Sequence, residues 1–280
     1  MNCQNFSPSP PLRPYVEEFT YLTSSTSYPL PESLPPGGRS GLLINLGTDC
    51  QVGFPGLIQR LPNFAIGGQL THTMQLTHQA GCQIIMITFR TTGFYRLLGL
   101  PMGELANQVL DIETVFPLLF RQQWRSLPDQ LRALDSIDER IWLLEKQLLL
   151  LVNRLPTVSG TWVEEASTWL AQRGSGRIQR LATELRISPR HLGREFTRQV
   201  GISPKSFAQV MRFRTIFRAA HTQESLCWSD LVHLGGWYDQ AHFCNDVQEI
   251  TGLTPTAFFA QQHATTGMLL NNHDTARSFS

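Results

Sequence analysis

The stretch IQRLATELRISPRHLGREFTRQVG, residues 178–201, has the pattern of two short helices joined by a tight turn. Apolar residues recur at spacing four on each side of the turn, as on one face of a helix. Ser188 is a good N-cap for the second helix, and Pro189 suits its first position, where the missing N–H needs no partner. Gly201 follows as a C-terminal stop. The stretch therefore predicts a helix-turn-helix unit.

The second of these predicted helices is apolar on one face and basic on the other. Leu192, Phe196 and Val200 recur at spacing four on the apolar face. Arginine on the opposite face can contact guanine edges with two hydrogen bonds or bind phosphates, as in a helix that lies in the major groove of DNA. The alternative is a solvated basic surface. The residues expected to meet DNA are Arg190, His191, Arg194, Thr197 and Arg198.

A second unit of the same kind occupies residues 229–252. Its turn is Gly235-Gly236, Trp237 fills the gap between its helices, and Asp239 is in the N-cap position. Gln and Asn side chains can hydrogen-bond adenine edges. For the histidine of this unit, a half-buried structural role is the alternative to a base contact. The outward residues are Gln240, Ala241, His242, Asn245, Gln248 and Glu249.

The two units differ in charge. Residues 173–218 contain 11 Lys and Arg and two acidic residues, whereas residues 219–262 contain five acidic residues and no Lys or Arg. Because phosphate contacts dominate DNA affinity, we expect the first unit to anchor the protein and the second to discriminate weakly or to engage only some sites. A long helix is predicted between the units. Its arginines add phosphate-binding capacity, with ordinary surface arginines as the alternative; they are Arg212, Arg214 and Arg218.

Over about residues 160–262, the chain resembles the AraC/XylS family of bacterial transcription regulators. The resemblance rests on an ordered set of motifs. They are ISPRHL (187–192), Phe196, GISP (201–204), Arg212, YDQAHF (238–243) and TGLTP (251–255). It implies a seven-helix bundle whose two recognition helices enter successive major grooves. The base-facing positions that it implies are Arg190, Gly193, Arg194, Gln240, Ala241, His242 and Asn245.

Two departures from the family pattern affect the second unit. Val247 stands where the family usually has Phe, which leaves a smaller side chain in the predicted core. The basic residues that the family has near Asn245 and Gln248 are missing. Both departures weaken the expectation of strong DNA binding by this unit.

The composition of the 280-residue chain is that of a globular protein, with 41% hydrophobic residues and a net charge of +1. Its basic charge is therefore local. The start lacks the pattern of a signal peptide, and no apolar run approaches the length of a membrane span. The five cysteines are scattered, which indicates free thiols in a reducing cytoplasm, with a redox sensor as the alternative. We expect a cytoplasmic protein without a membrane segment.

In the N-terminal part, short apolar runs at 41–47, 64–67 and 83–90 predict strands, and 93–99 predicts a short helix. This arrangement resembles the cupin-like sensor half of many AraC-family members. The spacing of His72 and His78 is poor for a metal site, so we expect no metal and no other cofactor. We expect an effector pocket, with ordinary core packing as the alternative for each residue of its lining. That lining is Phe54, Phe64, Met86, Phe89 and Tyr95.

The segment between the two parts is predicted to be helical from residue 116. Ser136 and Glu139 have the spacing of a capping box. Apolar residues then follow over 137–155 in a heptad pattern, and so wide an apolar surface must be buried. This helix either packs on the N-terminal domain or forms a homodimer interface. We expect a homodimer through 137–155.

The predicted fold class is α+β, with an N-terminal cupin-like β-barrel or sandwich with helices and a C-terminal all-α bundle with two helix-turn-helix units. The expected domains are a sensor at 1–116, a helical connector at 117–158, a DNA-binding domain at 159–263 and a flexible tail at 264–280.

The resemblance implies a sequence-specific transcription regulator with double-stranded DNA and RNA polymerase as partners. A small-molecule effector would bind the N-terminal domain and act through the connector. The sequence contains no nucleophile elbow, phosphate loop or paired carboxylates, so we do not expect an enzyme. Two alternatives remain: an AraC-like interaction protein with weakened DNA binding, and a cupin-type enzyme with a DNA-binding appendage.

Overall fold

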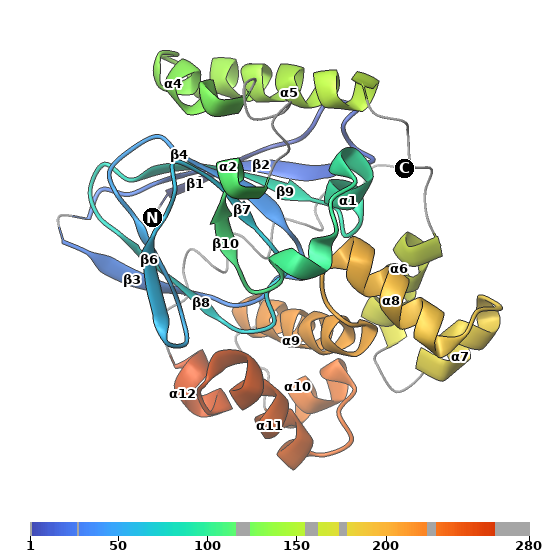
Figure 1. Ribbon diagram of the computed structural model, residues 1–280. Helices are drawn as coiled ribbons and strands as arrows, with labels where there is room; N and C mark the ends of the chain where they lie inside the picture. The colour runs from blue at the N-terminus through green and yellow to red at the C-terminus, as the bar shows by residue number, and fades with distance from the viewer. Residues whose placement is uncertain are drawn as a thin grey trace.

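The computed structural model describes residues 2–26, 28–115, 124–154, 162–173, 178–222 and 228–260. These residues form an N-terminal β-sandwich and a C-terminal bundle of helices, which confirms the α+β fold class (Figure 1). None of the helices in the described residues is long and apolar enough to cross a membrane. The tail at 264–280 and the start of the connector at 116–123 lie outside the described residues.

The sandwich consists of two antiparallel sheets. The larger sheet has the order β1 (Asn2–Phe6), β2 (Val16–Thr23), β9 (Gln83–Phe89), β4 (Gly41–Asn45), β7 (Phe64–Gly67) and β10 (Val109–Asp111). The smaller sheet has the order β3 (Leu30–Leu34), β8 (Met74–His78), β5 (Gln51–Phe54) and β6 (Leu57–Arg60). The strands predicted at 41–47, 64–67 and 83–90 are confirmed as β4, β7 and β9.

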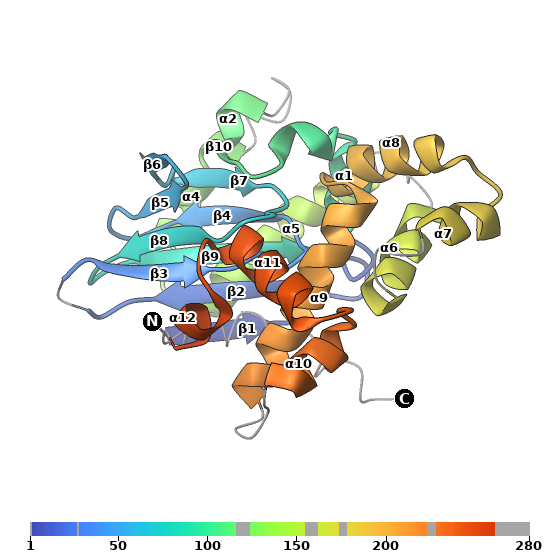
Figure 2. The ribbon, with the colours of Figure 1, turned by 90° about the horizontal axis from the view of Figure 1, so that it is seen from below.

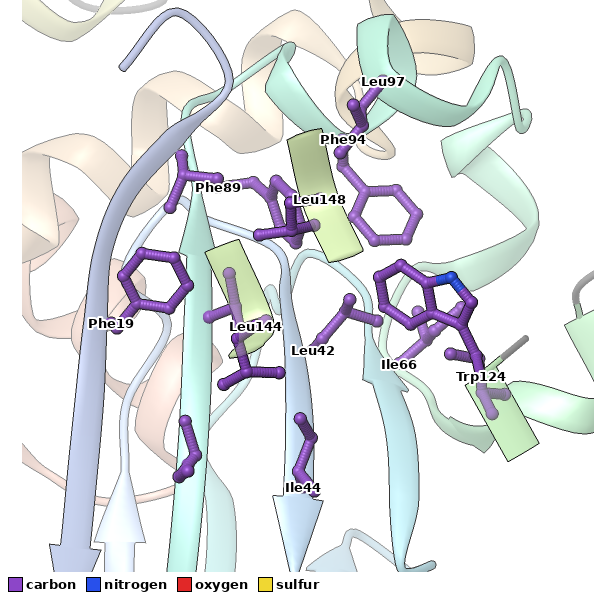
Figure 3. Close-up of a cluster of buried hydrophobic side chains, with 14 of the residues drawn as sticks. Phe19, Leu42, Ile44, Ile66, Phe89, Phe94, Leu97, Trp124, Leu144 and Leu148 are labelled. Carbon is purple, nitrogen blue, oxygen red and sulfur yellow. The ribbon is translucent and has the colours of Figure 1, made fainter. Parts of the chain in front are cut away.

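The central strands of the larger sheet are buried on both faces. Successive residues of a strand point to opposite sides. On β9, Ile87 and Phe89 point away from the smaller sheet and pack with the connector helices in a cluster that we call the outer cluster. Met86 and Thr88 face the smaller sheet. Figure 3 shows Leu42, Phe89 and Leu144 among the side chains of that outer cluster.

The described residues of the N-terminal part also form the helices α1 (Gly93–Leu98), α2 (Ile112–Val115), α4 (Leu127–Arg132) and α5 (Ile137–Arg154). The 3-10 helix η1 (Met102–Leu105) follows α1. The predicted capping box of α5 is confirmed: the N–H of Ser136 donates to Glu139 Oε2 at 3.2 Å, and the N–H of Glu139 donates to Ser136 Oγ at 3.2 Å.

The heptad seam of α5 packs on the larger sheet. The outer cluster, which contains residues of β4 and β9, buries four residues of this seam: Ile141, Leu144, Leu148 and Leu151. Of the two alternatives for this helix, packing on the N-terminal domain is therefore confirmed, and a homodimer through 137–155 stays a prediction. Leu155, the last seam residue, lies outside the described residues.

The C-terminal bundle runs from α6 to α12. Its helices are α6 (Trp162–Arg173), α7 (Ile178–Glu184), α8 (Pro189–Val200), α9 (Pro204–Thr222), α10 (Trp228–Gly235), α11 (Gln240–Thr251) and α12 (Pro255–Phe259). The long helix α9 belongs to two cores. Phe207 packs with the helices before α9, and Phe213 and Phe217 pack with those after it.

The bundle lies against the sandwich on the side away from α5, as Figure 1 and the view from below in Figure 2 both show. The N–H of Thr73 donates to the carbonyl of Ile250 at 2.8 Å, and Arg96 forms an ion pair of 3.1 Å with Glu164. Helix η1 packs on α8. The N-terminal part therefore contacts both predicted recognition helices.

Candidate nucleic-acid interface

The first helix-turn-helix unit is formed by α7 and α8, and its local geometry matches the prediction. Ser188 Oγ accepts a hydrogen bond from the N–H of His191 at 3.1 Å, so Ser188 is the N-cap of α8. Arg186, in the turn, has a φ of 55°, a left-handed conformation that is uncommon outside glycine. Gly201 ends α8 with a φ of 106°. These contacts fix the orientation of α8.

The outward face of α8 is open at its N-terminal end. Leu192, Phe196 and Val200 are fully buried on the inner face, as predicted. Arg190 is exposed, and 71% of the Arg194 side chain is exposed. A Cβ at Gly193 would meet no atom within 4 Å, so the helix surface between these arginines is accessible to a DNA groove.

The C-terminal end of α8 is in contact with the N-terminal domain. Arg198 donates to the hydroxyl of Tyr95, lies 4.8 Å over its ring and forms an ion pair of 2.7 Å with Glu195. The hydrogen bond from Arg198 lowers the pKa of Glu195. The Cγ2 atom of Thr197 lies 3.3 Å from the point where a Cβ on Gly103 would be. Of the six positions predicted on α8, Thr197 and Arg198 thus contact the N-terminal domain in this structure.

His191 takes an intermediate position between the two ends. It is half-buried, its ring centroid lies 5.8 Å from that of Trp162, and its Nδ1 lies 3.2 Å from Arg194 Nη2. The histidine can therefore orient Arg194 on the open face of α8.

The second unit is formed by α10 and α11. Asp239 Oδ1 accepts a hydrogen bond from the N–H of His242 at 2.8 Å, which confirms Asp239 as the N-cap of α11. Trp237 is buried in the turn as predicted. A Cβ on Gly235 would lie 1.7 Å from the Trp237 ring, so only glycine fits beside this indole. Gly252 ends α11 with a φ of 74°.

The outward residues of α11 are exposed, namely Gln240, Ala241, His242 and Asn245. His242 Nε2 also lies 3.7 Å from Asp246 Oδ1, so both of its predicted roles have support. Val247 is fully buried among the aromatic residues of the second core. The face of α11 thus offers amide groups but no arginine or lysine to DNA.

The structure differs from the prediction at two arginines of α9. The Arg212 side chain is 15% exposed, forms an ion pair of 2.8 Å with Asp246, and lies 5.2 Å from the centre of the Trp237 ring. Arg214 is buried, and its charge acts on the carboxyl group of Glu18 in β2. Both arginine side chains are thus largely buried, so neither guanidinium group is available on the surface to bind DNA phosphates.

Asp246 is the residue that sequence reasoning missed. In the sequence it counts only as one of the acidic residues that oppose DNA binding by the second unit. It accepts hydrogen bonds from Arg212, from Trp237 Nε1 at 2.7 Å and from Gln209 Nε2 at 3.1 Å. Its position three residues after Phe243 and four before Ile250 places it on the buried face of α11, and this spacing was the available signal.

Comparisons with known proteins agree with this geometry. A family profile described as a helix-turn-helix domain matches residues 181–261. The C-terminal domain is an AraC-type helix-turn-helix domain. A second profile, described as a domain of unknown function (DUF6597), matches residues 4–111 and thus covers the sandwich as a separate domain. A search of curated proteins finds no match.

Several solved structures are similar to this chain at low identity. ToxT from Vibrio cholerae O395 is 10% identical, with 86% of this chain and 97% of that chain covered and a TM-score of 0.47. Unsaturated fatty acid bound ToxT from Vibrio cholerae strain SCE256 is 8% identical, with 86% and 94% covered and a TM-score of 0.48. The AraC-like transcriptional activator CuxR is 12% identical, with 72% and 76% covered and a TM-score of 0.28.

The predicted effector lining is not brought together in the domain that precedes the AraC-type domain. Phe64 stacks on Trp124 at 5.5 Å in the outer cluster, which also contains Phe89 and Tyr95. Phe54 packs in the cluster between the sheets. Of the five, Met86 lines a cavity that lies between the two sheets. Phe64, Phe89 and Tyr95 do not line this cavity, because their side chains point to the opposite face of the larger sheet or lie beside it.

Proposed function

We propose that this chain is a sequence-specific DNA-binding transcription regulator. The observation that carries the proposal is the pair of capped recognition helices in one AraC-type domain. The open face of α8 presents Arg190 and Arg194, and the open face of α11 presents Gln240 and Asn245. Arginine suits guanine and phosphate, and amide side chains suit adenine.

The two units contribute differently in this proposal. The exposed arginines of α8 supply the charge that binds phosphates. On α11, Glu249 accepts a hydrogen bond from Gln209 at 2.8 Å and adds negative charge near the exposed amides. The first unit therefore anchors the protein, and the second reads sequence with less affinity. This asymmetry also supports the second candidate, an interaction protein with weakened DNA binding.

Regulation by a small molecule is part of the proposal. The N-terminal domain contacts α8 through Tyr95 and η1, and it contacts α11 through Thr73. A ligand that changes the shape of the N-terminal domain would change the access of both helices to DNA. The regulator would act in the cytoplasm by recruiting or blocking RNA polymerase. A homodimer would need a surface other than the buried seam of α5.

The test is to incubate the full-length protein with fragmented genomic DNA near physiological salt and to sequence the retained fragments. We expect a small set of sites that share two motifs about one helical turn apart. A single motif would mean that only α8 reads sequence. Retention without any shared motif, or no retention, would contradict the proposal and favour the interaction protein.

A substitution then assigns the reading to α8. Arg194→Ala should weaken binding to the selected site by about 1–3 kcal/mol and relax the preference at one position. The matched control is Arg60→Ala, which removes an exposed arginine of β6 and should leave the affinity unchanged. Equal effects of the two variants would show that α8 is not the reader.

A further inference from the structure

A cavity of about 140 Å³ lies between the two sheets of the N-terminal domain. Its wall is almost entirely apolar. The apolar side chains that line it are Leu34, Pro35, Leu43, Leu70, Met74, Met86 and Val109. Hydroxyl groups come from Ser40 and Thr88, and the one charged side chain of the lining is Arg39. The cavity therefore suits an apolar molecule that carries a single polar group.

Thr88 supplies the polar contact. It lies on β9 opposite Glu18 of β2 and Gly41 of β4, and 5% of its surface is exposed. Its Oγ1 atom has no hydrogen-bond partner among the described residues. A buried hydroxyl group without a partner is unfavourable, so native proteins usually satisfy such a group with protein, water or ligand. Thr88 lines the cavity, so a change of its side-chain rotamer would bring this buried hydroxyl group to a ligand there.

The surroundings of Arg39 disfavour an anionic ligand. Its guanidinium binds Glu17 through two nitrogens and donates from Nη1 to the Gly38 carbonyl and to Thr91 Oγ1, both at 3.1 Å. A carboxylate ligand would have to displace Glu17. Burial, and then the charge of Glu17, raise the pKa of the neighbouring Glu18 to about 7, so the region already resists negative charge.

The volume sets the size of the ligand. An engineered cavity of about 150 Å³ with an apolar lining stays dry and binds benzene. The cavity here has nearly the same volume and adds the hydroxyl groups of Ser40 and Thr88 to a largely apolar wall. Two of its seven apolar side chains are methionines, whose sulfur makes favourable contacts with aromatic rings. A single aromatic ring with one hydroxyl group fits both the volume and the chemistry.

The walls of the cavity also contact the AraC-type domain. A Cβ on Gly38, in the loop that follows β3, would lie 2.6 Å from Met211 Sδ of α9. Gln69, in the loop that follows β7, packs on Gly201 at the end of α8. Thr73, next to the lining residue Met74, donates to the carbonyl of Ile250 in α11. Three segments at the cavity thus touch the three helices α8, α9 and α11.

We propose that this cavity binds an uncharged molecule the size of one aromatic ring, whose hydroxyl group is hydrogen-bonded by Thr88, and that it is the effector site. The statement that the cavity is the effector site rests on the regulatory function proposed above. The binding part stands on the cavity and on Thr88.

The test measures the dissociation constants of phenol, toluene and benzoate for the full chain by ligand-observed NMR. Phenol should bind, and benzoate should bind more weakly. Thr88→Val keeps the shape of the side chain and removes its hydroxyl group, so it should weaken phenol binding about five- to tenfold and leave toluene binding unchanged. Thr77→Val, on β8 and outside the cavity lining, is the matched control and should change neither.

Several results would overturn the assignment. Absence of phenol binding to the folded protein would show that the cavity holds only water. Tighter binding of benzoate would exclude the uncharged class, and equal losses of phenol and toluene in Thr88→Val would exclude the hydrogen bond. Val109→Phe should fill the cavity and abolish binding of both rings; because that variant can misfold, the Thr88→Val comparison decides independently.

The two proposals fail in different ways. Ligand binding is measured without DNA, so absence of DNA binding in the presence and absence of phenol would contradict the proposed function and leave the cavity assignment intact. Phenol binding without any change in DNA affinity would contradict the effector role of the site.

Discussion

Replacement of Asp246 by alanine removes the acceptor that joins α9, the turn of the second unit and α11. The carboxylate accepts from Arg212 at 2.8 Å, from the Trp237 indole at 2.7 Å and from Gln209 at 3.1 Å. All three donors come from outside α11. The variant would leave a guanidinium and an indole N–H without their acceptor in a largely buried position.

The size of the effect follows from burial. The Asp246 and Arg212 side chains are 11% and 15% exposed, so solvent screens their interaction only weakly. Removal of one partner of a buried ion pair costs about 3–5 kcal/mol. The unsatisfied indole N–H alone costs about 1–3 kcal/mol, and the two effects overlap because they share one carboxylate. We therefore expect Asp246→Ala to lower the free energy of unfolding of the second unit by about 3–5 kcal/mol.

Urea unfolding followed by tryptophan fluorescence measures this loss as a lower midpoint at similar slope. Asp49→Ala is the matched control, because Asp49 forms an exposed ion pair with Arg60 and such pairs contribute about 1 kcal/mol or less. The double variant Arg212→Leu/Asp246→Leu should lose less than the sum of the single losses. A loss below about 1 kcal/mol for Asp246→Ala would refute the reasoning.

Three further predictions follow from the same geometry. Arg194→Gln should reduce the slope of log affinity against log salt by about 0.9, as for one lost phosphate contact. Arg212→Gln should lower stability and leave that slope unchanged. Equal slopes for both variants would contradict the buried position of Arg212. Gly235→Ala should destabilise the protein by at least about 1–3 kcal/mol because its methyl group overlaps the indole ring in the turn, and a stable variant would show that the turn can relax. Gly193→Ala, in open space within α8, should instead raise the free energy of unfolding by about 0.5–1 kcal/mol. Burial raises the pKa of Glu18 from 4.5 to about 7, so the folded protein holds this proton more tightly than the unfolded chain. The free energy of unfolding should therefore fall as pH rises through that window, and Glu18→Gln should remove this fall. If the stability gain of Glu18→Gln over the natural protein is the same at pH 5 and pH 8 in urea unfolding, the result argues against this prediction.

The features that were predictable from sequence are those set by local contacts. Each recognition helix begins at a side chain that bonds an N–H three residues later, so Ser188 and Asp239 could be recognised without knowledge of the rest of the chain. The capping box at Ser136 and Glu139 is of the same kind. The helix-turn-helix units were predictable for this reason.

The faces of the central strands were not predictable, because both faces of the larger sheet are buried. A strand with one solvated face alternates between apolar and polar residues, and the polar positions then mark the outside. On β9, Ile85 and Ile87 face the outer cluster, whereas Ile84 faces the smaller sheet. Without polar alternation, the sequence predicts the strand but not which of its residues face the cavity. Phe89 was therefore placed in the cavity and Thr88 was overlooked.

The charge of the basic segment shows how long-range contacts change a functional inference. Residues 173–218 contain 11 basic side chains, but several of them have acidic partners in the fold. Arg212 pairs with Asp246, which lies 34 residues away, and Arg180 pairs with Glu184 at 2.8 Å. Arg198 pairs with Glu195 beside the N-terminal domain. Each of these pairs lowers the number of phosphates that the basic segment can neutralise, so the salt dependence of DNA binding should correspond to far fewer contacts than the count of basic residues suggests.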